Sequence, residues 1–331
     1  MKTNTISEKE SNAIVIIRAT AMFSIVLCHL FQAYNVLSLA SVFNIGVQVF
    51  LVMSGYLYGK KQITSWSQWY KKRFLKLYIP FTIVWLSVFL FHFIFKTDTI
   101  KWYNIVNFLT NLQGLRLVFD ISQLHVSGLS HLWFMTAIMF AYFSTPVLQS
   151  LKKYSQLCLV LILIFFAIFY FHLTPRGRWL FGVEWFWLYA FGYFFANISI
   201  KARKFYMCLF AFIYLYALTQ IKRPQDIIYL WSILGRRHHC ALGILLFTTG
   251  VTYLQRFTIN SKNMAVFRWF DKYSFFIYLT HFTVMVGTLS LAKITNHLFV
   301  NVLLMILVSA ILTYLLVIAN NFITNRIQQR L

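Results

Sequence analysis

The sequence predicts an all-α protein that is embedded in a membrane and crosses it about ten times. Of its 331 residues, 60% are hydrophobic and only 11% are charged, whereas about 25% are charged in an ordinary soluble domain. Apolar windows of spanning length recur along the chain, and most Lys and Arg residues lie between them. A net charge of +23 would suggest nucleic acid as a partner of a soluble protein. Here the charge flanks apolar segments, so membrane lipids are the expected partner and nucleic acid is not.

Ten windows are long and apolar enough for us to expect a transmembrane helix in each. They cover residues 13–34, 42–59, 77–96, 131–150, 156–173, 182–198, 204–220, 239–257, 273–293 and 298–321. The second and sixth windows are short, so those helices are expected to be tilted, broken or partly re-entrant. Little chain is left over, so residues 1–331 are predicted to form a single transmembrane domain with no appended soluble domain.

The distribution of Lys and Arg predicts the orientation, because positive charge is retained in cytoplasmic loops. With the N-terminus in the cytoplasm, 19 of the 30 Lys and Arg residues lie on that side and 10 on the other. Both termini are therefore expected in the cytoplasm of a multi-pass protein of the plasma or inner membrane. Two outer connections are long, 97–130 and 221–238. The first is expected to hold an interfacial helix, and the second is basic and aromatic enough to meet anionic head groups.

The first window carries two polar side chains, Arg18 and His29, among apolar or small neighbours. They are eleven positions apart, or about three turns, so both lie on one helix face, separated by about 16 Å along the axis. A charge inside the bilayer costs roughly 3 kcal/mol on insertion scales and needs a partner or a function. The pattern favours a polar path with a cation near its mouth and a titratable base deeper in. Alternatively, Arg18 snorkels to the head groups and His29 simply bonds to a neighbouring helix.

Two further segments carry candidates for binding. Ser54 and Gly55 would let another helix or an extended ligand approach the second helix closely. Arg73 and Lys76 are three residues apart, so they can share one helix face and hold a phosphate, with Lys72 beside them. Taken alone, Ser54 and Gly55 are better explained by helix packing, and the basic cluster by a positive-inside anchor.

The later windows add aromatic and imidazole side chains. His131 and Trp133 begin the fourth window, where an aromatic belt would explain the tryptophan alone. Tyr278 and His281 are one turn apart inside the ninth window, so Tyr278 is a candidate hydroxyl neighbour for a second intramembrane base. Core packing is the alternative. The four cysteines lack metal-ligand spacing, and no metal is expected.

Together these segments resemble the acyltransferase-3 family of integral membrane acyltransferases. The likeness consists of Arg18 and His29 in the first helix, "FLVMSGYL" in the second, "KRFLKLYIP" before the third, "HLWFM" at the fourth and "YLTH" near the end. The segments follow the family's order and cover nearly the whole chain. No single segment is specific, and the ordered set carries the resemblance.

The resemblance implies a ten-helix enzyme that takes an acyl group, usually acetyl, from cytoplasmic acetyl-CoA. The implied acceptor is a sugar hydroxyl of a cell-surface polysaccharide or its lipid-linked precursor. His29 matches the family's catalytic residue and Arg18 its partner along the acyl path. The residues that match the family's donor site are Arg73 and Lys76, with Lys72 beside them, for the phosphates, and Ser54 and Gly55 near the donor channel.

Two positions depart from the family's pattern. Val15 stands where the family usually has an acidic residue three before the arginine, which removes one counter-ion for Arg18. Lys76 stands where arginine is common, so a point charge replaces a bidentate fork. The sequence leaves open whether His29 removes the acceptor's proton or accepts the acyl group transiently.

Two rival functions fit the composition. A polysaccharide flippase or polymerase would also be basic and aromatic but would need no coenzyme A site. A proton-coupled transporter would use intramembrane Arg and His as a relay. The scarcity of acidic residues within the apolar windows and the lack of a sequence repeat count against the transporter.

Overall fold

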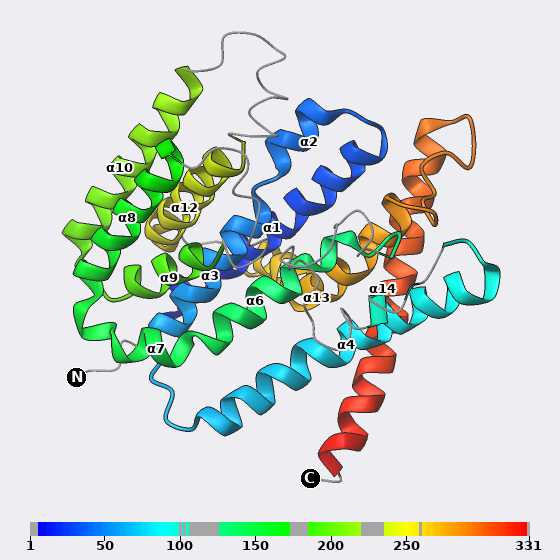
Figure 1. Ribbon diagram of the computed structural model, residues 1–331, viewed down its shortest axis with the longest axis horizontal. Helices are drawn as coiled ribbons and strands as arrows, with labels where there is room; N and C mark the ends of the chain where they lie inside the picture. Colours follow the sequence, from blue (N-terminus) through cyan, green and yellow to red (C-terminus); the bar gives the residue numbers. More distant parts are fainter. Residues whose placement is uncertain are drawn as a thin grey trace. The chain divides into compact units, whose positions relative to one another are not determined.

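The computed structural model describes the backbone of residues 6–98, 101, 104–105, 126–172, 185–219, 235–257 and 260–329. Every regular element within these ranges is a helix (Figure 1), which confirms the all-α prediction. Each of the ten predicted windows overlaps a helix. Four helical stretches in the described ranges are long and apolar enough to cross a membrane: Glu8–Ala33, Leu37–Gly59, Trp66–Phe95 and Leu298–Ile327. Ten spans and cytoplasmic termini stay predictions.

The chain divides into two compact units, and α1 (Glu8–Ala33) and α13 (Ser261–Met285) contribute residues to both. Unit 1 comprises Met1–Cys28, Leu37–Gln62 and Ala137–Asp271. Unit 2 comprises His29–Val36, Ile63–Thr136 and Lys272–Leu331. The helix α6 (Trp133–Phe143) begins in unit 2 and continues into unit 1.

Unit 1 is organised around two helices, α3 (Gly46–Gly59) and α9 (Phe186–Phe195), which lie side by side (Figure 1). A Cβ at Gly55 would overlap the backbone carbonyl of Tyr189, and a Cβ at Gly192 would overlap that of Val52. The two glycines therefore let the helices approach until their backbones touch. The other elements that lie wholly in unit 1 are α2 (Leu37–Phe43), α7 (Thr145–Ser150), η3 (Lys152–Tyr154), α8 (Ser155–His172), α10 (Ile200–Thr219), α12 (Gly235–Tyr253) and η7 (Leu254–Arg256).

The second predicted window is broken, as its short length suggested. Helix α2 ends at Phe43 and α3 begins at Gly46. The Ser24 hydroxyl donates a 2.7 Å hydrogen bond to the Phe43 carbonyl, which satisfies an acceptor at the break. Gly46 packs so closely on α1 that a Cβ there would overlap the carbonyl of Ala21.

Unit 2 contains α4 (Trp66–Phe95), η2 (Ser130–Leu132) and α14 (Leu298–Gln329), together with most of α13. Helices α4 and α14 pack against each other. The Thr280 and Thr313 hydroxyls share a 2.8 Å hydrogen bond between α13 and α14. Helix α4 continues through Pro80, so the segment 71–80 lies inside a helix rather than ahead of one.

Two helix ends differ from the predicted windows. The ninth window was predicted at 273–293, but α13 runs from Ser261 to Met285. It stops there because Gly287 adopts a φ of 101°, which no right-handed helix contains. The fourth window is divided into α6 and α7 near Pro146, which has no N–H to donate to the carbonyl of Tyr142.

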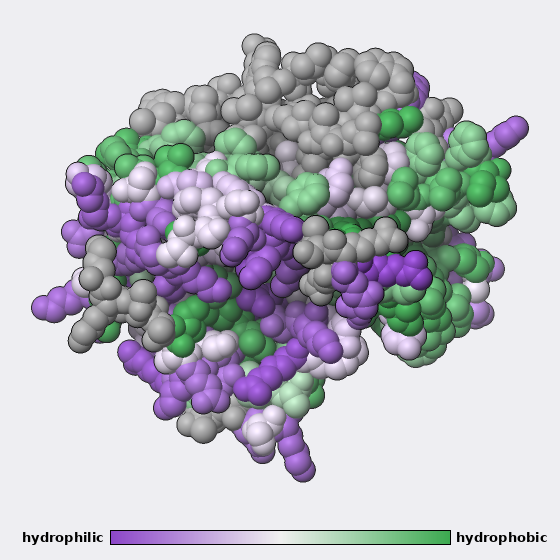
Figure 2. Space-filling view, turned by 90° about the horizontal axis from the view of Figure 1, so that it is seen from below, coloured by the Kyte–Doolittle hydropathy of each residue, from purple (hydrophilic) through white to green (hydrophobic). Residues whose placement is uncertain are grey.

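The exposed surface is rich in apolar side chains, as expected for contact with lipid. Helix α14 exposes apolar side chains along its length, including Phe299, Leu303, Ile311, Tyr314 and Phe322. Broad hydrophobic areas also lie beside hydrophilic ones on the face drawn in Figure 2. Water would disfavour such a surface, whereas hydrocarbon accommodates it.

Candidate functional site

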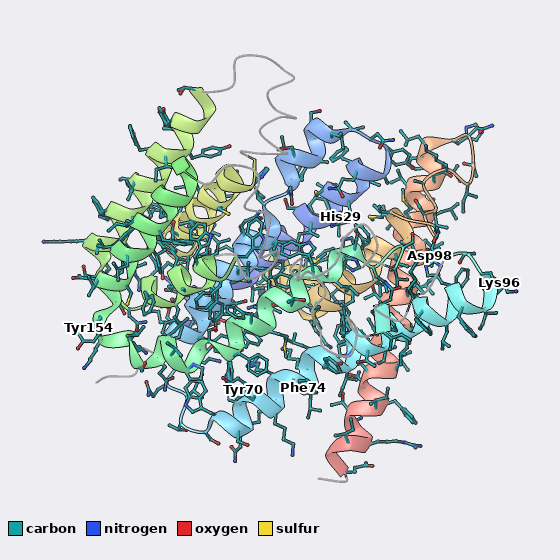
Figure 3. All side chains as sticks on the ribbon, in the orientation of Figure 1. His29, Tyr70, Phe74, Lys96, Asp98 and Tyr154 are labelled. Carbon is teal, nitrogen blue, oxygen red and sulfur yellow. The ribbon has the colours of Figure 1, made fainter. Side chains whose placement is uncertain are left out.

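Three histidines that are far apart in the sequence come together in unit 2. His29 lies near the C-terminal end of α1 (Figure 3), His131 in η2 and His281 in α13. The ring centroids of His29 and His281 are 5.3 Å apart, and those of His131 and His281 are 5.8 Å apart. Phe282 packs against His29 and His131, with a centroid distance of 4.6 Å to each. We call His29, His131 and His281 the histidine cluster.

Hydrogen bonds fix the protonation of two of these rings. His29 Nδ1 lies 2.7 Å from Gln32 Oε1, and His281 Nδ1 lies 2.8 Å from the Ile277 carbonyl oxygen. Both partners only accept hydrogen bonds, so each Nδ1 must carry the proton and donate. In a neutral ring the lone pair is then on Nε2. The cluster thus presents two bases with the same tautomer.

The backbone around His131 is held by α13. The Tyr278 hydroxyl donates a 2.5 Å hydrogen bond to the His131 carbonyl, and the Thr283 hydroxyl donates one of 3.2 Å to the Gly128 carbonyl. The Tyr278 hydroxyl thus bonds to the backbone of η2, while the ring centroids of Tyr278 and His281 lie 6.3 Å apart. A role for Tyr278 as the hydroxyl neighbour of His281 stays a prediction. Trp133 stands two residues further along, half-buried beside Phe134.

The buried imidazoles of unit 2 differ in whether their ring nitrogens have hydrogen-bond partners. His92 in α4 is fully buried, and its two ring nitrogens lie 2.7 Å from Thr97 Oγ1 and 3.1 Å from the Ser127 carbonyl oxygen. His131 and His281 are 4% and 1% exposed. Both ring nitrogens of His131 and Nε2 of His281 have no hydrogen-bond partner among the described residues. A buried ring nitrogen without a partner is costly, so these two histidines are candidates for a role beyond packing.

The cluster is not arranged as a metal site. Within the described ranges, no three side chains among His, Cys, Asp and Glu form a group that could hold a metal ion. What the cluster offers is hydrogen-bond acceptors and nucleophilic nitrogens in an apolar setting, which suits proton transfer or acyl transfer.

Arg18 has a carboxylate partner that is far from it in the sequence. In unit 1, its Nη1 donates to both carboxylate oxygens of Asp271, at 2.8 and 3.0 Å. Both side chains are partly buried, with exposed fractions of 27% and 17%. Asp271 lies outside the ninth predicted window, 273–293, but inside α13. Asp271 takes the place of the counter-ion that Val15 cannot supply.

The predicted donor-site residues lie on α4 and α3. Arg73 and Lys76 are one turn apart on α4, Arg73 half-buried and Lys76 exposed, and Lys72 is exposed beside them. Ser54 is half-buried in α3, and Gly55 touches the backbone of α9. Helix packing therefore accounts for Gly55. The donor role of all five residues remains a prediction.

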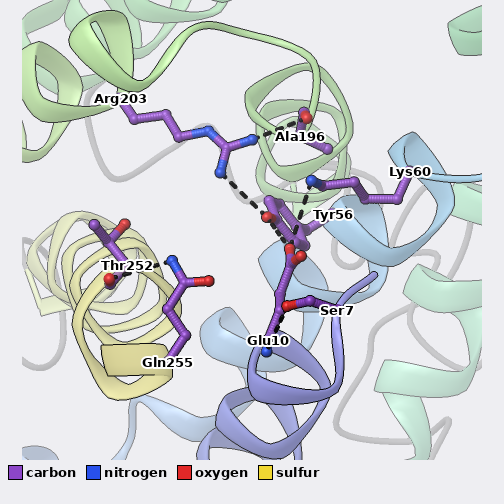
Figure 4. Close-up of polar contacts among 8 residues, drawn as sticks. All are labelled: Ser7, Glu10, Tyr56, Lys60, Ala196, Arg203, Thr252 and Gln255. Carbon is purple, nitrogen blue, oxygen red and sulfur yellow. Dashed lines mark hydrogen bonds and ion pairs between the residues drawn. The ribbon is translucent and has the colours of Figure 1, made fainter. Parts of the chain in front are cut away.

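A polar cluster in unit 1, absent from the sequence prediction, joins three helices (Figure 4). Tyr56 donates its hydroxyl proton to Glu10, and the Lys60 ammonium lies 3.5 Å from the same carboxylate. Arg203 donates to the Tyr56 hydroxyl at 3.3 Å and to the Ala196 carbonyl at 3.0 Å. Burial lowers the pKa of Lys60, and the Glu10 carboxylate opposes that shift. Glu10 and the tyrosine of "MSGY" were visible in the sequence, but nothing in their spacing indicates that they meet.

Two of the predictions concern the long outer connections. Most of the connection 97–130 and residues 221–234 of the second connection lie outside the described residues. The interfacial helix and the head-group contact therefore stay predictions.

The comparison with protein families gives one match. The model of the acyltransferase-3 family, described as an acyltransferase domain, matches residues 12–319. The matched range includes every site residue predicted from the sequence. No significant match is found among curated proteins or solved structures.

Proposed function

Since the chain belongs to the acyltransferase-3 family, we propose that it transfers an acetyl group from cytoplasmic acetyl-CoA to a sugar hydroxyl. The acceptor is a cell-surface polysaccharide or its lipid-linked precursor. Family membership and the apolar helices make the chain an integral membrane acyltransferase. The proposal adds the donor, the acceptor and a plasma- or inner-membrane location with ten spans and cytoplasmic termini.

The proposal depends mainly on His29. Gln32 holds the Nδ1 proton of His29, so that the Nε2 lone pair is available to the substrates. An imidazole has an ordinary pKa near 6.5 and is mostly neutral at pH 7, so it can act as base or nucleophile. Proton transfer by a positioned base contributes about 100- to 10,000-fold to a rate. This nitrogen is therefore assigned to the reacting end of the acyl path.

The cationic residues are assigned to the donor. The pair Arg73 and Lys76, with Lys72 nearby, would hold the phosphates of coenzyme A at the cytoplasmic end of α4. Ser54 and Gly55 would lie near the donor channel. Arg18 is three turns before His29 on α1 and would stabilise negative charge along the acyl path. Its ion pair with Asp271 holds the guanidinium in a defined orientation.

The test is acetylation of the cell-surface glycan. NMR spectra of the glycan are compared between cells that lack the gene and cells that express the wild type, His29→Ala or His297→Ala at matched levels. We expect O-acetyl signals with the wild type and at least about a 100-fold loss with His29→Ala. His297 is an exposed histidine of the same unit, so His297→Ala should behave as wild type.

Turnover of labelled acetyl-CoA by the purified protein separates the enzyme from its rivals. A flippase, polymerase or proton-coupled transporter would release no CoA. Full glycan acetylation by His29→Ala would refute the assigned role of His29. Identical glycans with and without the gene would refute the acceptor.

A further inference from the structure

His281 lies beside His29 and is a second base. The two ring centroids are 5.3 Å apart, and each ring donates its Nδ1 proton to a fixed acceptor, Gln32 Oε1 or the Ile277 carbonyl. Each Nε2 then carries a lone pair. A lone pair only accepts, so a hydrogen bond to either Nε2 needs a donor, and a hydroxyl group supplies one.

The two routes left open for acyl transfer place different demands on the site. If His29 takes the acceptor's proton directly, one base is enough. If His29 carries the acyl group on Nε2, that nitrogen is blocked when the acceptor arrives, and a second base is required. A second base whose Nδ1 donates to the Ile277 carbonyl and whose Nε2 has no hydrogen-bond partner among the described residues fits the covalent route.

Resting on the proposed function, we propose that His29 carries the acyl group and His281 is the general base for the acceptor hydroxyl. His281 is assigned this role rather than His131 because its Nδ1 proton is fixed by the Ile277 carbonyl. The ring of His131 faces the backbone of Leu279 and Tyr278, but neither of its nitrogens makes a well-formed hydrogen bond within the described residues.

The proposed transfer takes place in two steps. His29 Nε2 attacks the thioester carbonyl carbon, the C–N bond forms, the C–S bond breaks and coenzyme A leaves as the thiolate. The acylated imidazole is cationic, and its Nδ1–H stays bonded to Gln32 Oε1. The acceptor oxygen then attacks the same carbon, the C–O bond forms and the C–N bond breaks. The hydroxyl proton passes to His281 Nε2, and His281 releases it to solvent, where it neutralises the thiolate.

The experiment uses the full chain in detergent with [¹⁴C]acetyl-CoA. Hydroxylamine serves as a nucleophile that attacks acyl imidazoles without a base. Membranes from cells that lack the gene serve as the source of hydroxyl acceptor. The main variant is His281→Asn, whose amide can still donate to the Ile277 carbonyl but lacks a base. His281→Gln is a second variant in case the first fails to fold. The control is His92→Gln, which removes another buried imidazole of unit 2.

The wild type should release one equivalent of CoA in a burst and retain label on the protein. His281→Asn should keep the burst and a hydroxylamine-driven rate within about twofold of wild type, but lose about 100-fold or more in transfer to the membranes. His29→Ala should lose both. His92→Gln should lower stability while keeping both activities per folded molecule.

Three results would overturn the inference and leave the proposed function intact. The first is transfer to membranes by His281→Asn within about threefold of wild type, well short of the loss that removal of a positioned base causes. The second is an equal loss of the CoA burst and of the transfer to membranes in His281→Asn. The third is transfer to membranes by the wild type without any label on the protein. A wild-type protein that releases no CoA with any nucleophile, or that labels no acceptor in the membranes, would instead refute the proposed function.

Discussion

Arg18 shows how a charged residue is tolerated in an apolar helix. An unpaired guanidinium inside a bilayer costs roughly 3 kcal/mol on insertion scales. Its two contacts with the Asp271 carboxylate, at 2.8 and 3.0 Å, offset part of that cost. Because both side chains are partly buried, the pair is screened less than one on a surface. The pair therefore accounts for the position of Arg18 without snorkelling.

Breaking this pair from one side should destabilise the protein. Arg18→Met leaves a carboxylate without its cation, and we expect a loss of roughly 2 kcal/mol, between the values for exposed and buried pairs. Asp271→Asn should have a similar effect. The double variant should lose clearly less than the sum of the single losses, because no unpaired charge remains. Unfolding midpoints in detergent measure the effect.

The control for these Arg18 and Asp271 variants is Arg268→Met, on the same helix as Asp271. Arg268 is exposed and donates to Asn12 Oδ1 at 3.1 Å, so its loss should change stability by less than about 0.5 kcal/mol. Strictly additive losses in the Arg18 and Asp271 variants would mean that the two side chains are not coupled.

Only some residues of the candidate site could be predicted from the sequence. His29, Tyr278 and His281 stand out because polar groups are rare in apolar windows, and His131 follows from its motif. Gln32 is at the polar end of its window, where a glutamine is unremarkable. Its role depends on a bond to a ring one turn earlier on the same helix. That contact is set by side-chain orientation, which residue type does not determine.

At the scale of elements, the contact between α3 and α9 depends on the absence of side chains. Gly55, Gly59 and Gly192 each lie so close to the facing helix that a Cβ would overlap backbone atoms. Backbone atoms cannot move aside as the end of a flexible side chain can. The contact therefore tolerates no added methyl group without separation of the helices.

Gly55→Ala and Gly192→Ala are accordingly expected to destabilise the protein. Each should cost roughly 1–3 kcal/mol, the range for overpacked interiors, although alanine is the better helix former. Thermal unfolding in detergent measures this cost. Ser87→Ala, at an exposed position of α4, should unfold as wild type does. A rise in stability for either glycine variant would show that α3 and α9 are not in backbone contact.

Helix existence was predictable, whereas helix ends were not. Hydropathy located the apolar part of each helix, because burial in hydrocarbon requires it. Helix α13 begins twelve residues before its window because polar residues such as Lys262 and Arg268 are compatible with a helix outside hydrocarbon. Its end depends on the backbone of Gly287, and a lone glycine gives only a weak signal in a sequence.

At the scale of the whole molecule, the predicted orientation depends on charge rather than on packing. The two long connections assigned to the outer side are 97–130 and 221–238. Most of the Lys and Arg residues are assigned to the opposite side. Coenzyme A is a cytoplasmic donor, so the proposed function needs the Arg73 and Lys76 end of α4 on the cytoplasmic side. If the predicted orientation is wrong, the assignment of the donor site to these residues is therefore wrong as well.

Reporter fusions test that orientation directly. Alkaline phosphatase is active only outside the cytoplasm, whereas green fluorescent protein, exported unfolded, fluoresces only inside. With 19 Lys and Arg residues on the predicted inner side against 10 outside, a fusion after Leu331 should fluoresce as green fluorescent protein and be inactive as phosphatase. Fusions at Lys101 should give the converse. Phosphatase activity at the C-terminus would place Arg73 and Lys76 away from cytoplasmic acetyl-CoA if the number of spans is even. It would then exclude them as the site for the phosphates of the donor.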